Sequence, residues 1–176
     1  MKYIINKSKP TFCLSHSLCS FRTSKAYLWG LVQSRLLEIS RTTTSTFRCL
    51  DAACHALITR DMFPANCQYY GLDISASRLQ KAFSLKQPND HLLKADLCRN
   101  LPLSSSFDVV VSLNTLSHMP IQQQNLALSN LIDSVCNNGN LFVNSDISSA
   151  IMDISQKLYS EFSSVEVVYF DSYLSR

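Results

Sequence analysis

Short strand-like runs alternate with helix-like runs along this 176-residue chain, and this alternation is the feature that most constrains its fold. The strand-like runs, rich in apolar and β-branched residues, lie at 47–51, 68–73, 91–96, 107–113, 141–143 and 165–170. The helix-like runs, whose apolar residues recur every three or four positions, lie at 24–40, 77–86, 121–136 and 149–162. Alternation of this kind favours βαβ units. The sequence therefore predicts an α/β fold with an open parallel sheet of six strands and helices on both faces.

Breakers and apolar spacing refine the predicted helices. Pro120 precedes the helix at 121–136, where its missing N–H costs little. The run NNGN at 137–140 is expected to end this helix, because Asn and Gly tolerate the left-handed conformation of helix ends. The residues predicted to face the core include Leu37 in the first helix, Phe83 in the second and Leu126 in the third.

Composition narrows the class of protein. Hydrophobic residues make up 46% of the chain and charged residues 16%, which argues against a disordered chain. No apolar run approaches the roughly 18 residues that a membrane span needs. The seven cysteines form no CxxC pair, and an odd number of them suits reduced thiols. We therefore expect a cytoplasmic protein with no membrane segment and no metal site.

Basic residues gather near the N-terminus. Residues 1–48 hold eight Lys and Arg residues against the single acid Glu38, whereas the remainder holds eight basic and twelve acidic residues. We predict that residues 1–23 form a basic, flexible extension and that residues 24–176 form the folded domain. A transit peptide and a nucleic-acid-binding arm are the alternatives for the extension.

Oxygen-bearing side chains stand at the carboxyl ends of four of the predicted strands. They are Asp51, Asp73, Asp96 and Asn114, with Asn144 a weaker addition. Ligands of open parallel sheets bind beyond the carboxyl ends of the strands. Asp73 follows Asp51 by 22 positions, close to the interval of about 20 at which a carboxylate meets ribose hydroxyls. The pattern predicts a site for a nucleoside-type cofactor, and turn or helix capping is the alternative role of each aspartate.

Short motifs surround these residues. They are CLDAACHA at 49–56, YGLDIS at 70–75, KADL at 94–97, LPL at 101–103, SFDVV at 106–110, LSHMP at 116–120 and NGNL at 138–141. In order and spacing, over about residues 24–170, they resemble the motifs of class I S-adenosylmethionine-dependent methyltransferases that act on small molecules. The resemblance implies a Rossmann-like sheet, S-adenosylmethionine as the cofactor and a small molecule as the substrate.

The resemblance also implies a role for each motif residue. The methionine part of the cofactor would face Asp51 and the loop at 53–56, which includes Ala53 and His55. The ribose would face Asp73 and Ile74, and the adenine would face Asp96 and Leu97. The transferred methyl group would lie near Asn114. His118 is the candidate general base, because a histidine has a pKa suited to proton removal. A surface or capping role is the alternative for His118.

The sequence departs from the family's pattern in two places. Ala53, His55 and Leu57 stand where the family has glycine, which such loops use for close approach to the ligand and for positive φ. His55 would then either obstruct the cofactor or contact its carboxylate as a donor. The short sequence after the sixth predicted strand also leaves little room for the antiparallel strand that completes the family's sheet.

Two functions from different classes follow. The first is methyl transfer from S-adenosylmethionine to a small molecule, and the second is an inactive methyltransferase-like domain that serves as a binding or scaffold module. A nicotinamide dehydrogenase is disfavoured because the Gly-rich turn is absent. Nucleic acid is not expected as a partner, since only the basic N-terminus favours it, and the sequence does not indicate an oligomeric state.

Overall fold

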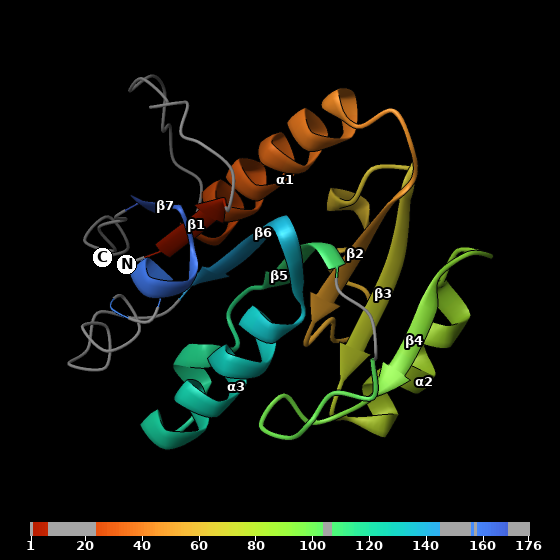
Figure 1. Cartoon of the computed structure of the whole chain (residues 1–176). Helices are drawn as coiled ribbons and strands as arrows, with labels where there is room; N and C mark the ends of the chain where they lie inside the picture. The colour runs from red at the N-terminus through yellow and green to blue at the C-terminus, as the bar shows by residue number, and fades with distance from the viewer. Residues whose placement is uncertain (1, 7–23, 104–106, 145–155, 157, 169–176) are drawn as a thin grey trace.

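Seven strands form one sheet within the part of the chain that this computed structural model describes, residues 2–6, 24–103, 107–144, 156 and 158–168 (Figure 1). The strands are β1 (Lys2–Asn6), β2 (Phe47–Ala52), β3 (Cys67–Asp73), β4 (His91–Lys94), β5 (Phe107–Ser112), β6 (Val135–Asn144) and β7 (Ser164–Val168). Their order across the sheet is β4-β3-β2-β5-β6-β1-β7. The first five in this order are parallel to one another, which confirms the predicted Rossmann-like sheet.

Helices cover both faces of the parallel strands. They are α1 (Ser24–Thr42), α2 (Ala76–Leu85) and α3 (Ile121–Asp133), with the short 3-10 helices η1 (Arg60–Met62) and η2 (Leu116–His118). The core of one face joins α1, α2 and η1 to the sheet, and the core of the other face joins α3 and η2 to it. Neighbouring residues of β5 show the division, because Val109 packs in the α1 core and Val110 in the α3 core.

The outer part of the sheet differs from the sequence-based prediction. β1 lies between β6 and β7 and is antiparallel to both. Its residues 2–6 belong to the segment 1–23 that the charge pattern assigns to a flexible extension, while residues 7–23 lie outside the described residues. The antiparallel strand, for which the C-terminal sequence leaves little room, is therefore present and comes from the N-terminal end.

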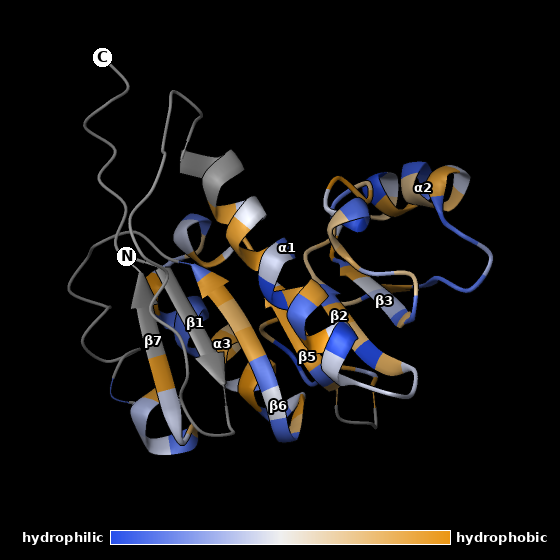
Figure 2. Ribbon diagram, turned by 90° about the horizontal axis from the view of Figure 1, so that it is seen from above, coloured by the Kyte–Doolittle hydropathy of each residue, from blue (hydrophilic) through white to orange (hydrophobic). Residues whose placement is uncertain are grey.

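The helix α3 ends at Asp133 and not near residue 136, and the run 137–140 lies inside β6. The pairing of β5 with β6 is irregular between Phe107 and Val109, so this run forms a bulge. Asn138 adopts a φ of 65°, and a Cβ on Gly139 would lie 3.0 Å from the carbonyl oxygen of Asp108. The left-handed conformation of Asn138 and the missing Cβ of Gly139 thus serve a bulge here and not a helix end. In Figure 2, β6 is hydrophilic in this part and hydrophobic toward its arrowhead.

The buried faces of the helices agree with the predicted faces to within about one residue position. Leu37, Phe83 and Leu126 are exposed to 39%, 56% and 54%, so their predicted core positions are wrong. Ala127, next to Leu126, is fully buried in its place. Residues 156 and 158–161 are helical, as predicted, while the first part of the helix predicted at 149–162 lies outside the described residues. No helix in the described ranges is both long and apolar enough to cross a membrane.

Candidate functional site

A cavity of about 560 Å³ opens at the carboxyl ends of β2, β3 and β5. All nine residues that the sequence singles out for the site line it: Asp51, Ala53, His55, Asp73, Ile74, Asp96, Leu97, Asn114 and His118. Asn144, the weaker candidate, is not among the lining residues. The parallel topology explains the convergence, because the last residues of parallel strands meet at one edge of the sheet.

Asp51 is the next-to-last residue of β2 and is 3% exposed. Its Oδ2 accepts hydrogen bonds from the Tyr69 hydroxyl and the Thr59 hydroxyl, both at 2.7 Å. Burial raises the pKa of Asp51 to about 6, against the lowering effect of these two hydrogen bonds. Burial and the neighbouring Asp51 carboxylate also raise the pKa of Tyr69, so the phenol stays protonated and remains a donor. The Asp51 carboxylate can therefore change its charge just below neutral pH.

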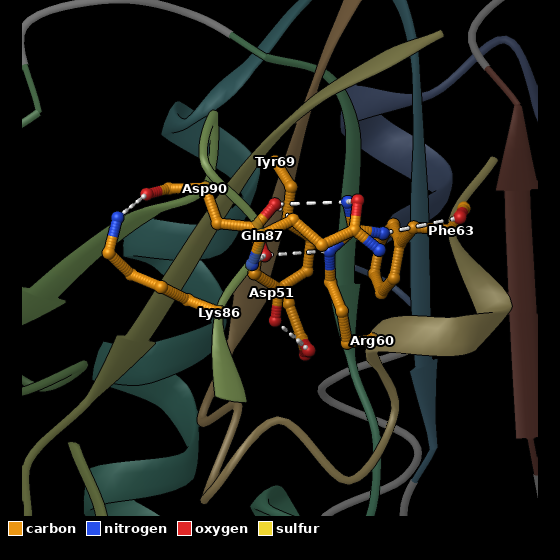
Figure 3. A network of polar contacts seen from close by, with 7 residues as sticks. All are labelled: Asp51, Arg60, Phe63, Tyr69, Lys86, Gln87 and Asp90. Atoms are coloured by element: carbon orange, nitrogen blue, oxygen red, sulfur yellow. Dashed lines mark hydrogen bonds and ion pairs between the residues drawn. The ribbon is translucent and has the colours of Figure 1, made fainter. Parts of the chain in front are cut away.

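A buried ion pair holds Tyr69, the residue that donates to Asp51, in place (Figure 3). The Arg60 guanidinium lies 4.7 Å from the centre of the Tyr69 ring and pairs with Asp90 at an Nη2–Oδ1 distance of 3.0 Å. It also donates to the Gln87 side chain at 2.9 Å and to the Phe63 carbonyl at 3.3 Å. Because Arg60 and Asp90 are both nearly buried, each leaves an uncompensated charge if the other is removed. The network fixes Tyr69, and through it Asp51.

The loop after β2 has an unusual backbone. Ala53, His55 and Leu57 have φ values of 69°, 55° and 61°. The family that the motifs resemble has glycine at these three positions. Here the loop follows a left-handed path although all three residues carry a Cβ. Each such residue costs about 1–2 kcal/mol relative to a relaxed backbone. Glycine suits such a loop because it adopts a positive φ without the steric cost of a Cβ.

Backbone hydrogen bonds hold the loop against β3. The N–H groups of Ala53 and Cys54 both donate to the Leu72 carbonyl, at 2.7 and 2.9 Å. The His55 N–H donates to Asp73 Oδ2 at 2.9 Å, and the Leu57 N–H donates to the Cys54 carbonyl at 3.0 Å. These bonds offset part of the conformational cost and leave little freedom for the loop to shift.

Asp73 ends β3 and is 1% exposed. Its Oδ1 accepts from the Ser75 N–H at 2.8 Å and its Oδ2 from the His55 N–H, while Arg78 Nη1 lies 3.9 Å from Oδ2. Each carboxylate oxygen has two lone pairs, so both oxygens can accept a further hydrogen bond from a ligand. The carboxylate is thus rigidly held at the cavity wall.

The remaining predicted residues line the cavity from loops. Asp96 lies two residues beyond β4, and its Oδ1 accepts from the Cys98 N–H at 2.9 Å. Asn114 has a φ of 55°, and its N–H donates to Asn144 Oδ1 at 2.6 Å. Asn144 therefore supports Asn114 from behind. His118, in η2, is exposed.

Some lining residues were not found from the sequence. They include Trp29 of α1, Ile58 and Thr59 of the loop, Arg78 of α2, and Thr115 and Met119 near η2. Trp29 precedes every parallel strand, and its place depends on how α1 packs across the sheet. The hydrogen bonds of Thr59 and Tyr69 to Asp51 are likewise tertiary contacts. No local pattern signals any of these.

The chemistry of the cavity suits a nucleoside cofactor with a charged amino-acid end. Carboxylates of Asp51, Asp73 and Asp96 can accept from hydroxyl and amino groups. One nitrogen of the His55 ring, Nδ1, is buried and has no hydrogen-bond partner among the described residues. Within the same residues, no group of three or more His, Cys, Asp or Glu side chains is placed to hold a metal ion.

A five-stranded parallel sheet with such a cavity at its carboxyl edge defines a Rossmann-like nucleotide-binding domain. Residues 50–141 match the model of the methyltransferase domain family. The chain therefore belongs to that family, and its fold is that of the class I S-adenosylmethionine-dependent methyltransferases, as the motifs predicted. S-Adenosylmethionine is the cofactor of this class.

Solved structures of methyltransferases share the fold at low sequence identity. An amino pentose methyltransferase from Micromonospora echinaspora, involved in calicheamicin biosynthesis and solved with bound S-adenosylmethionine, is 17% identical (TM-score 0.59) over 77% of this chain and 61% of its own. A TehB-like S-adenosylmethionine-dependent methyltransferase from Corynebacterium glutamicum is 15% identical (TM-score 0.58) over 72% of this chain and 71% of its own. Magnesium protoporphyrin IX methyltransferase from Synechocystis is 19% identical (TM-score 0.57) over 74% and 67%. No curated protein sequence is significantly similar to the chain.

Proposed function

We propose that this protein transfers a methyl group from S-adenosylmethionine to a small molecule. The observation that carries the proposal is the convergence of the nine sequence-selected residues on one cavity. When bound, the cofactor supplies a sulfonium-activated methyl group, so the protein contributes mainly the alignment of the acceptor. The cavity of about 560 Å³ lies within the range of about 300–1,000 Å³ that is common for small-molecule sites.

The proposed cofactor contacts follow the strand ends. Asp73 accepts from the ribose hydroxyls with Ile74 beside it, since its oxygens are fixed by two backbone donors and keep lone pairs toward the cavity. Asp51 and Ala53 face the methionine part. Asp96 accepts from the adenine amino group, and Leu97, which is 4% exposed, packs beside the ring.

The proposed acceptor side lies near η2. Asn114 stands close to the methyl group. Its position is fixed by the 2.6 Å hydrogen bond from its backbone N–H to Asn144 Oδ1. His118 acts as the general base when the acceptor needs to lose a proton; its exposure keeps it in reach of an entering molecule. Trp29 and Met119 supply apolar surface for the acceptor.

Titration of the purified full chain with S-adenosylhomocysteine in a calorimeter tests the proposal. We expect saturable binding in the micromolar range. Asp73→Asn should weaken it by about 1–3 kcal/mol, the cost of unpairing groups in a buried site. Asp133→Asn is the matched control, because Asp133 is exposed at the end of α3 and does not line the cavity. Equal affinity in Asp73→Asn and the parent would place the ribose elsewhere.

One observation favours the second candidate, an inactive binding or scaffold module. The left-handed loop carries three side chains where glycine is suited, and His55 lines the cavity. If these side chains close the methionine part of the site, the titration gives no heat with S-adenosylhomocysteine. The same experiment therefore separates the two functions.

We also propose that the protein works in the reducing cytoplasm. Four cysteines in the described part of the chain, Cys49, Cys54, Cys67 and Cys98, are free thiols, which suits a compartment where disulfides are rare. Cell fractionation should recover the chain with cytosolic markers, and its recovery in an oxidising compartment would contradict the proposal.

A further inference from the structure

We propose that the His55 imidazole recognises the amino-acid end of the cofactor by donating a hydrogen bond to its carboxylate. This inference rests on the proposed function. It concerns a residue that replaces a glycine of the resembled family, so the contact would be a property of this chain and not of the family's motif.

The loop's backbone N–H groups are largely occupied. Those of Ala53 and Cys54 donate to the Leu72 carbonyl, that of His55 donates to Asp73, and that of Leu57 donates to the Cys54 carbonyl. A carboxylate arriving at this loop therefore does not find these four donors available. In residues 53–57, His55 is the residue whose side chain carries an N–H group.

The charge of the cavity favours such a donor. Three carboxylates, those of Asp51, Asp73 and Asp96, line it and repel the carboxylate of a ligand. The lining guanidinium of Arg78 lies 3.9 Å from Asp73, at the ribose end of the proposed site, and its side chain is half-exposed. A hydrogen-bond donor from the 53–57 loop would therefore stabilise a carboxylate bound beside it, and the His55 ring can supply one.

The burial of the ring selects its donor atom. Nδ1 is buried and has no partner among the described residues, so a proton on Nδ1 would be an orphaned buried N–H group, which folded proteins avoid. The neutral ring therefore carries its proton on Nε2. His55 lines the cavity and its Nδ1 is enclosed, so the proposal assigns the hydrogen bond to Nε2.

The backbone of His55 is consistent with a functional role. Its φ of 55° is a strained conformation for a residue with a Cβ, and such strain persists where the surroundings fix it and is frequent in ligand sites. The bond from its N–H to Asp73 fixes the residue between the proposed ribose and methionine positions.

Two ligands and two near-isosteric variants test the inference by calorimetry on the full chain. S-Adenosylhomocysteine carries the carboxylate, and 5′-methylthioadenosine has the same nucleoside and thioether without the amino-acid end. His55→Gln keeps an N–H donor near the Nε2 position, whereas His55→Leu keeps similar bulk and the same backbone strain without the donor. Thermal unfolding of both variants verifies that the fold is retained.

We expect His55→Leu to weaken S-adenosylhomocysteine binding about tenfold or more, the range for a hydrogen bond to a charged group. His55→Gln should bind it within about threefold of the parent, and both variants should bind 5′-methylthioadenosine like the parent. Unchanged S-adenosylhomocysteine binding in His55→Leu, or an equal loss for both ligands, overturns the inference while leaving the proposed function standing. Tighter S-adenosylhomocysteine binding in His55→Gly overturns it too, since the ring would then be an obstruction. A parent that binds neither ligand refutes the proposed function itself.

Discussion

Replacing Ala53 by glycine should stabilise the protein, although most substitutions in a folded loop destabilise. At a φ of 69° an alanine costs about 1–2 kcal/mol more than a glycine. The glycine variant loses about 0.4–1 kcal/mol of folding free energy, because glycine gives the unfolded chain more conformational freedom. Removal of a half-buried methyl group costs about 0.4 kcal/mol more. The net expectation is a gain of about 0.5 kcal/mol, or about 1–2 °C in the unfolding temperature of a chain of this size.

Ala56→Gly is the matched control, because Ala56 is also half-buried, lies in the same loop and does not have a positive φ. It should lose about 0.8–1.4 kcal/mol, because it has the unfolded-chain effect and the same methyl loss without any relief of backbone strain. The two variants should therefore differ by about 1 kcal/mol or more in urea unfolding. Equal destabilisation by Ala53→Gly and Ala56→Gly would refute the left-handed path of the loop.

Three further predictions concern the wall of the site and the edge of the sheet. Burial raises the pKa of Asp51 from 3.8 to about 6, so its ionised form is disfavoured in the folded state. The free energy of unfolding should therefore fall by about 3 kcal/mol in all as the pH rises from below 3.8 to above 6. This fall should vanish in Asp51→Asn when urea unfolding is measured against pH. Asp90→Ala leaves Arg60 buried without its partner and should cost about 3–5 kcal/mol in urea unfolding, whereas Ala at the exposed Asp133 should change little. Deletion of residues 1–6 removes β1 from between its two partners and should lower the unfolding temperature; an unchanged temperature would favour the flexible extension and a domain that begins at residue 24.

The parallel sheet and the place of the site could be predicted because their signals are local. A buried strand shows itself as an apolar run, and a strand that ends in Asp51 or Asp73 places that side chain at the carboxyl edge whatever the distant packing is. Nine of the residues that line the cavity are therefore predictable from the sequence, although the contacts of these residues with a cofactor stay a prediction.

The features that the sequence did not predict depend on tertiary contacts or on residues that serve two purposes. Asn138 and Gly139 can end a helix or form a bulge, and the pairing with β5 decides for the bulge. β1 is held in the sheet by partners more than 130 positions away in the chain. Its own sequence lies among basic residues that favour an extension, so the strand is not predicted locally. Trp29 reaches the cavity only because α1 packs across the sheet.

Trp29 gives the most direct measurement of the central claim, that this cavity binds an S-adenosyl cofactor. It is the chain's single tryptophan and it lines the cavity, so its fluorescence reports on what enters. Titration with S-adenosylhomocysteine should change the emission saturably, with a dissociation constant in the micromolar range, and Asp73→Asn should shift the midpoint to higher concentration while Asp133→Asn leaves it in place. An emission that stays constant through millimolar ligand, together with the absence of heat in the calorimeter, would contradict the claim.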